Sequence, residues 1–114
     1  MGTPEGSAQI MNDVTLTIDF GSAQRPPFEA VVRVPEKSTV LDVLLQVLPA
    51  TTSPKYGMDH FVEAIDGVHN DFANDRGWRF EVNGRGCNVP AERYLVKNKD
   101  WIKWQYRAGS CGQT

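Results

Sequence analysis

GWRFEVNGRGCNVPAERYLVKNKDWIKWQYR, residues 77–107, is the stretch that decides the fold. Apolar side chains recur at every second position near both of its ends: Trp78, Phe80 and Val82, then Ile102, Trp104 and Tyr106. A period of two is typical of a strand with one buried face, so residues 77–107 are predicted to hold the two closing strands of the domain. Asn83-Gly84 between them is the strongest turn dipeptide in the chain, because both residues tolerate positive φ.

Upstream, the same alternation predicts two further strands at 14–20 and 28–34, joined by a proline-bearing loop at 21–27. Ser38 or Thr39 is then placed to begin a helix, with Asp42 completing a capping box. Residues 40–48 carry a wide apolar stripe at helical spacing, and Pro49 is expected to end the helix.

The middle of the chain is predicted to be mostly irregular. Residues 50–56 are rich in Thr, Ser and Pro, and residues 68–77 are polar, so both stretches are interpreted as loops. A short strand is expected at 61–65, ended by the turn signal Asp66-Gly67. One turn of helix begun by Pro90 is expected between residues 88 and 93.

This order of elements predicts an α+β protein with a β-grasp-like mixed sheet and one covering helix. The first and last strands are expected to be central neighbours, and the sheet face away from the helix could stay in water, as mixed sheets allow. The domain is predicted to cover residues 13–108, after a disordered leader at 1–12 and before a C-terminal tail at 109–114.

The composition limits the classes of partner. The 114 residues suit one domain, and 12 basic residues scattered among 14 acidic ones give a net charge of −2. A nucleic-acid or anionic-membrane surface needs a dense basic field, so neither partner is expected. No apolar run or basic start marks an export signal, so the protein is expected to be cytoplasmic, or exported or at the cell surface if a leader was removed.

The motifs described so far resemble the transcobalamin C-terminal-like domain and its bacterial relatives of unknown function. The resemblance rests on Trp78-x-x-x-Val82-Asn83-Gly84, on Tyr94-x-Val96 and on Asp100-x-Ile102-x-Trp104-x-Tyr106. The chain has Lys99-Asp100 where that family usually has Gly-Asp, which changes a turn. The resemblance implies a β-grasp module, often on exported proteins, that closes over one side of a corrinoid opposite a helical domain, and it therefore implies cobalamin as a candidate ligand.

Sites of catalysis or metal binding are weakly marked. His60 and His69 are expected in or beside loops, and neither has a second His or Cys at zinc-ligand spacing. The Asn and Asp residues of 66–75 fit turns better than a calcium loop, and Gly84-Arg85-Gly86 fits a hairpin better than a phosphate cradle. Cys87 lacks a neighbouring base, so an enzyme is not expected, and a disulfide between Cys87 and Cys111 is left open.

Trp101 is the aromatic residue that falls outside the core pattern. It shares its parity with Lys103, Gln105 and Arg107, so it is expected on the outer face of the sheet. There it is either a contact point for a flat ligand or a protein, or it is covered by the excursion from Cys87 to Lys99.

The sequence thus predicts a non-catalytic domain that binds a small molecule, and the resemblance implies cobalamin or a related corrinoid as the candidate, with another flat molecule left open. The ligand is expected in the loops around 60–75 and 83–89. The candidate ligand-binding residues are His60, His69, Trp101, Asn83, Arg85 and Asn88. The alternative is a protein-interaction or adhesion module that uses a sheet edge or the Trp101 face.

Overall fold

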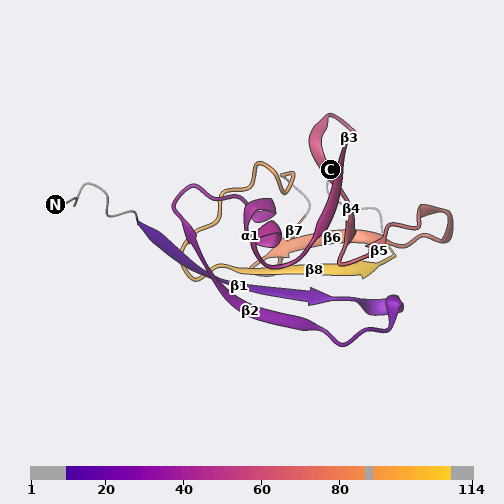
Figure 1. Ribbon diagram of the computed structural model, residues 1–114, viewed down its shortest axis with the longest axis horizontal. Helices are drawn as coiled ribbons and strands as arrows, with labels where there is room; N and C mark the ends of the chain where they lie inside the picture. Colours follow the sequence, from indigo (N-terminus) through magenta and orange to yellow (C-terminus); the bar gives the residue numbers. More distant parts are fainter. Residues whose placement is uncertain (1–9, 87–88, 109–114) are drawn as a thin grey trace.

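The computed structural model describes residues 10–86 and 89–108 (Figure 1). One helix, α1 (Val40–Val47), lies among eight strands and two short 3-10 turns, η2 (Gly21–Ala23) and η3 (Phe72–Asn74). The strands are β1 (Met11–Asp19), β2 (Phe28–Pro35), β3 (Ala50–Lys55), β4 (Met58–Ile65), β5 (Val68–His69), β6 (Gly77–Val82), β7 (Arg85–Gly86) and β8 (Trp101–Arg107). The first strand begins at Met11, two residues before the expected start of the domain. Cys87, Asn88 and Cys111, with the disulfide considered for the two cysteines, lie outside the described residues.

A five-stranded sheet in the order β2-β1-β8-β6-β7 is the larger of two sheets. Its centre is the parallel pair β1–β8, in which Thr15 lies opposite Trp101 and Ile18 opposite Trp104. The β1–β2, β6–β8 and β6–β7 pairs are antiparallel. The α+β fold class and the central pairing of the first and last strands are therefore confirmed.

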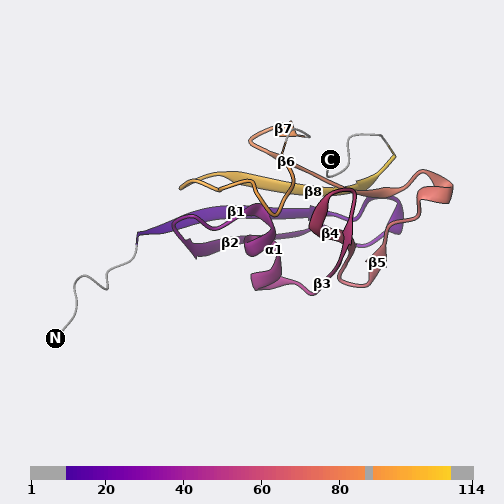
Figure 2. The ribbon, with the colours of Figure 1, turned by 90° about the horizontal axis from the view of Figure 1, so that it is seen from above.

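The core lies between this sheet and α1, which Figure 2 shows on one side of the sheet. The alternating residues of each strand supply it, and the aromatic rings stack across β6 and β8. The Trp78 and Tyr106 ring centroids are 5.1 Å apart, as are those of Phe80 and Trp104. All four side chains are buried, as the sequence pattern predicts.

The start of α1 follows the predicted capping box. Thr39 is the N-cap, its hydroxyl accepts the Asp42 N–H at 3.1 Å, and the Asp42 carboxylate accepts the Thr39 N–H at 2.9 Å. These two bonds satisfy backbone donors that the first turn of any helix leaves unpaired. Ser38, the other candidate, donates its hydroxyl to the Pro35 carbonyl instead.

A second sheet, in the order β3-β4-β5, was not expected. The prediction of a loop at 50–56 is wrong, because residues 50–55 form β3 and pair antiparallel with β4. The register shifts between Thr51 and Thr52, and again between Ser53 and Lys55. Pro54 therefore lies where the ladder is interrupted, and its missing N–H costs no regular hydrogen bond. β4 also begins three residues earlier than expected, and residues 68–69 form β5 within the predicted loop at 68–77.

Three two-residue turns close the hairpins, and each has positive φ at both residues: Tyr56-Gly57, Asp66-Gly67 and Asn83-Gly84. The latter two agree with the sequence expectation, because Asp and Asn tolerate this backbone region. Tyr56 at φ 56° is unusual for a bulky residue, and it explains why the first turn was not recognised.

Residues 89–97, here called the strap, cross from the β6–β7 hairpin to the start of β8. The strap lies against the N-terminus of α1: the Val40 N–H donates to the Tyr94 carbonyl, and the Leu41 N–H to the Ala91 carbonyl. The expected helical turn at Pro90 is a hydrogen-bonded turn only, in which the Arg93 and Tyr94 N–H groups both donate to the Pro90 carbonyl. Because the strap is bonded to the helix, Trp101 on the opposite face keeps 44% of its surface exposed.

Among the described residues, no helix has both the length and the apolar character required to cross a bilayer.

Two buried tryptophans provide a matched test of this core. The Trp78 indole N–H donates to the Val68 carbonyl at 2.7 Å and so ties β5 to the large sheet, whereas Trp104 Nε1 has no partner among the described residues. Trp78→Phe leaves the Val68 carbonyl unpaired, so we expect it to lower the free energy of unfolding by about 1–2 kcal/mol more than Trp104→Phe. Urea denaturation of the two variants measures this difference, and equal losses would contradict the assigned role of the Trp78 bond.

Candidate functional site

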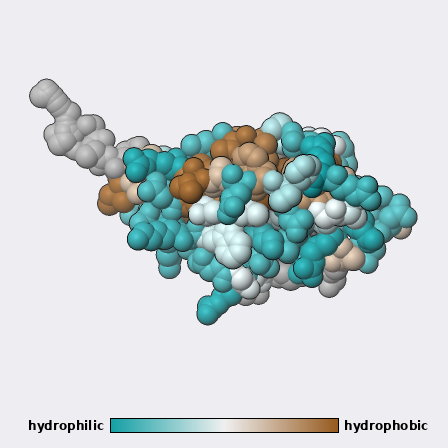
Figure 3. All heavy atoms as spheres, turned by 90° about the horizontal axis from the view of Figure 1, so that it is seen from below, coloured by the Kyte–Doolittle hydropathy of each residue, from teal (hydrophilic) through white to brown (hydrophobic). Residues whose placement is uncertain are grey.

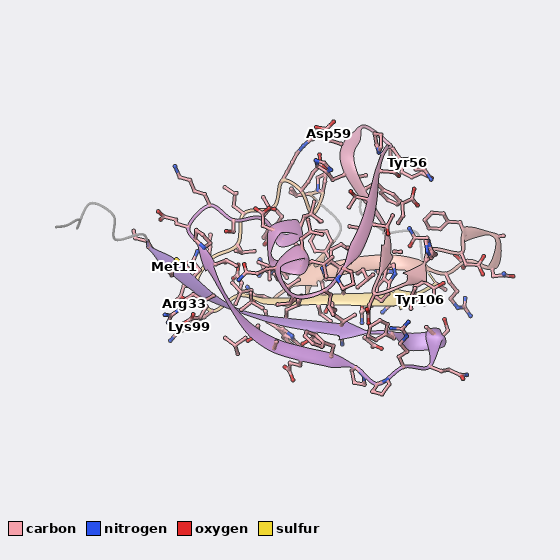
Figure 4. All side chains as sticks on the ribbon, viewed as in Figure 1. Met11, Arg33, Tyr56, Asp59, Lys99 and Tyr106 are labelled. Carbon is pink, nitrogen blue, oxygen red and sulfur yellow. The ribbon has the colours of Figure 1, made fainter. Side chains whose placement is uncertain are left out.

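The tip of the β3–β4 hairpin projects from the body of the molecule and carries Tyr56 and Asp59 (Figure 4). Glu92 in the strap holds this hairpin in place. Its carboxylate accepts the backbone N–H groups of Asp59 at 3.2 Å and His60 at 2.6 Å, and its side chain is only 10% exposed. A nearly buried carboxylate that accepts two N–H groups is a firm attachment, so the strap and the hairpin tip form one unit.

An open groove of about 360 Å³ lies along the strap, lined by Val89, Arg93, Tyr94, Leu95 and Lys97. Val89 and Leu95 are exposed apolar side chains of its lining. Arg93 reaches towards the hairpin tip, with its guanidinium 3.5 Å from the Gly57 carbonyl. The groove thus combines apolar side chains with two cations on a surface that is wide open to solvent.

Three aromatic rings form a row that runs from the β3–β4 turn through β4 to η3. The ring centroids of Tyr56 and Phe61 are 5.0 Å apart, and those of Phe61 and Phe72 are 6.5 Å apart. Phe61 is buried, but Tyr56 and Phe72 are 63% and 57% exposed. Large aromatic side chains left in water next to one another are typical of contact surfaces.

Gly77 makes room for one end of the aromatic row. A Cβ at this position would lie 2.7 Å from Phe72 Cε1, so any larger residue would displace the Phe72 ring. Tyr56 at the other end stands in the left-handed turn described above. The left-handed backbone at Tyr56 carries a conformational cost, which is common where side chains serve a contact, whereas Gly77 only leaves space for the Phe72 ring.

A polar cluster at the base of the hairpin supports this row. The Glu63 carboxylate accepts the Ser53 hydroxyl at 2.5 Å and pairs with the Lys55 ammonium at 2.7 Å. The hydrogen bond from Lys55 and then that from Ser53 hold the pKa of Glu63 below its ordinary value of 4.5. The same contact raises the pKa of Lys55.

Among the described residues, the structure brings three of the predicted site residues together and leaves the two histidines apart. Asn83 and Trp101 lie together, because the Asn83 Oδ1 accepts the Trp101 N–H at 2.9 Å, and Arg85 follows on the same hairpin. His60 lies beside the strap, through its N–H bond to Glu92. His69 lies in β5, where its carbonyl accepts the Tyr106 hydroxyl.

The expected position of His60 and His69, in or beside loops, is refined by the second sheet. His60 lies near the start of β4, and His69 is the last residue of β5, directly before the segment that leads to β6. Of the loop segments expected to hold the ligand, residues 66–75 precede β6, whereas the Asn83-Gly84 turn follows it, so these two segments lie at opposite ends of that strand.

The turn interpretation of the residues between 66 and 75 fits the structure. The Asp66 carboxylate pairs with Arg25 at 2.9 Å, and the Asn70 Oδ1 accepts the Trp78 N–H at 2.8 Å. Within residues 10–86 and 89–108, no three His, Cys, Asp or Glu side chains gather in a way that could hold a metal ion.

Several residues of this surface were missed by sequence reasoning: Tyr56, Phe72, Glu92, Arg93 and Lys97. The strap residues form no recognisable sequence motif. Their proximity to the hairpin depends on the contact of Glu92 with Asp59 and His60, which are distant in the chain, so it cannot be read from neighbouring residues. For the hairpin, the dipeptide Tyr56-Gly57 was the one available sequence signal, because a glycine between two stretches that can form strands indicates a turn.

Acid should weaken the hairpin through Glu63. Because its pKa is lowered on folding, the ionised carboxylate stabilises the protein above its ordinary pKa, and this stability is lost as the pH falls through the lowered pKa. Glu63→Gln cannot lose a charge, so we expect its stability to fall less between pH 5 and 3 than that of the parent protein. Chemical denaturation across this range measures the effect, with Glu29→Gln as the exposed control. Identical pH profiles for Glu63→Gln and the parent protein would contradict it.

Comparisons with known proteins agree with this geometry at the level of fold. The family model described as "Domain of unknown function (DUF4430)" matches residues 37–108. A crystal structure of haptocorrin in complex with Cbi superposes on 91% of this chain with a TM-score of 0.74 and 13% identity. This chain spans about a quarter of that protein, 27% of its length.

A second solved structure is a candidate metal binding protein from Ruminococcus gnavus ATCC 29149. It covers 87% of this chain and 99% of its own, with a TM-score of 0.62 and 17% identity. No curated protein sequence matches the chain. The likeness to haptocorrin confirms the resemblance to the transcobalamin C-terminal-like fold.

Proposed function

This chain belongs to the family described as a domain of unknown function (DUF4430), and from that premise we propose that it is a non-catalytic domain that binds a small, flat ligand, with a corrinoid as the first candidate. The groove along the strap carries the proposal. It offers the exposed apolar side chains of Val89 and Leu95 and the two cations Arg93 and Lys97, next to an aromatic hairpin.

A flat ligand suits this arrangement for a physical reason. The groove is open on one side, so it can cover one surface of a plate-shaped molecule and leave the other surface free for a second protein segment. The chain corresponds to 27% of haptocorrin, whose structure contains Cbi, and this share is consistent with a domain that supplies one side of a binding site.

His60 offers a specific contact to a corrinoid. The side chain is exposed, and its backbone is fixed by Glu92 beside the groove. The corrin ring supplies its own equatorial nitrogens to cobalt, so the protein needs to provide only one axial ligand, and imidazole is a suitable one. A bare ion would need several side chains, which do not gather anywhere in the described part of the chain.

A protein partner at the β2 edge is the alternative function. β2 is an outer strand of the large sheet, and its exposed Val31 favours this reading. However, the Gln46 amide donates to the Arg33 carbonyl at 3.1 Å, which blocks one of the groups that an added strand would use. The edge is therefore a less favourable site than the groove.

Titration with hydroxocobalamin tests the corrinoid proposal. We expect the parent protein to shift the visible spectrum as His60 replaces the axial water, and we expect His60→Ala to abolish the shift. Arg93→Gln should weaken binding several-fold, because it removes one cation from the groove.

His69→Ala is the matched control. His69 lies in β5 directly opposite Ala64 of β4. Ala64 is four residues from His60 along β4, so at 3.3 Å per residue about 13 Å separates the two histidine positions. The contact of His69 with Tyr106 uses the backbone carbonyl, which the substitution keeps. Absence of any shift or co-elution, or an equal loss in both histidine variants, would reject His60 as the axial ligand.

A further inference from the structure

The sheet face away from α1, here called the outer face, has no role in the groove. The strand registers arrange its side chains in rows, and two adjacent rows contain Trp101 and its neighbours. Val31, Thr15 and Trp101 form the first row across β2, β1 and β8. The second row is formed by Glu29, Thr17, Lys103 and Glu81, which belong to β2, β1, β8 and β6.

Trp101 is tied to this face by its side chain. Its indole N–H donates to the Thr17 hydroxyl at 2.9 Å, although Thr15 is its direct neighbour across the strand pair. The ring therefore extends diagonally over β1 instead of standing away from the sheet. One surface of the indole faces water, and its only polar atom is already bonded.

The backbone of Trp101 is equally well held. Its N–H donates to the Asn83 Oδ1, and the Asn83 amide donates to the Asp100 carboxylate at 2.9 Å. Asp100 is 8% exposed and also accepts the Lys97 N–H at 2.8 Å. A ligand would thus meet a side chain that loses little conformational freedom on binding.

The fold does not explain a tryptophan at this position. Trp101 points away from the core that Trp104 and Tyr106 fill, so a threonine or valine would serve the strand equally well. Beside it, Lys103, Glu29 and Glu81 form no ion pair within the part of the chain that the structure describes. Their donors and acceptors are available next to an apolar plate.

We propose that the outer face binds a carbohydrate, with one sugar ring stacked on Trp101. The C–H groups on one face of a pyranose match the indole in size, and they meet the negative surface of the aromatic ring. The surrounding hydroxyls receive hydrogen bonds from Lys103 and donate them to Glu29 and Glu81. Both charge signs alternate around the plate, which suits a neutral polyhydroxylated ligand better than an anion.

The size of the apolar area favours a sugar over a protein partner. A stable protein interface buries about 800 Å² on each side and depends on a cluster of large apolar residues. The outer face offers Trp101, Val31 and Met11 as its exposed large hydrophobic residues, in a field of polar side chains. Met11 lies four residues before Thr15 along β1, so it is separate from the other two. Figure 3 shows the molecule from the β2 side, where hydrophobic atoms form a limited strip on a largely hydrophilic surface.

The full chain applied to an array of neutral glycans, followed by titration with the best-bound oligosaccharide, tests the proposal. We expect saturable binding, which Trp101→Ala weakens at least tenfold and Trp101→Phe largely keeps, because phenylalanine retains an aromatic plate. In an NMR titration, the indole N–H signal of Trp101 should shift, while those of Trp78 and Trp104 stay in place because both are buried.

Tyr56→Ala removes an exposed aromatic residue from the hairpin and is the matched control, with no loss of glycan binding expected. His60→Ala should also bind the glycan normally, so this proposal stands or fails independently of the corrinoid site. The proposal is overturned if no glycan on the array binds, if Trp101→Ala binds as tightly as the parent, or if Tyr56→Ala weakens binding equally.

Discussion

The parallel pairing of β1 with β8 is the constraint on which the rest of the structure depends. It joins the first and last strands of the domain, so the chain between them has to begin and end at the centre of the sheet. β2 and β6 then add to the two sides of this pair, and α1 covers the apolar face that all four strands share. Burial of Leu16, Ile18, Ile102 and Trp104 from the central pair keeps it in place.

Asp100 connects this pairing to both candidate surfaces. Its carbonyl accepts the Thr15 N–H at the start of the parallel pair, and its carboxylate bonds to Asn83 and to the backbone of Lys97. One nearly buried residue therefore positions the end of the strap, which borders the groove, and the first residue of β8, which carries the outward indole. The two surfaces lie on opposite faces of the sheet but share this anchor.

The groove and the outer face differ in chemistry as well as position. The groove gathers exposed aliphatic side chains and two cations beside an aromatic hairpin, whereas the outer face sets one rigid indole among charges of both signs. A single small domain can present both, because a sheet covered by a helix on one side leaves its other side to the solvent. In each case the exposed apolar residue is held by hydrogen bonds of the backbone around it.

The sequence by itself determined the features that depend on neighbours along the chain. Alternation separated Trp101 from Trp78, Phe80, Trp104 and Tyr106, the Thr39–Asp42 box located the helix start, and Asn83-Gly84 located a hairpin. Only the tertiary structure decided that residues 50–55 form a strand, that the strap lies on the helix side, and that His60 and His69 are apart. Those outcomes rest on contacts between distant residues, such as Glu92 with His60 and β3 with β4, whose pairing leaves no periodic signal in a short, proline-interrupted segment.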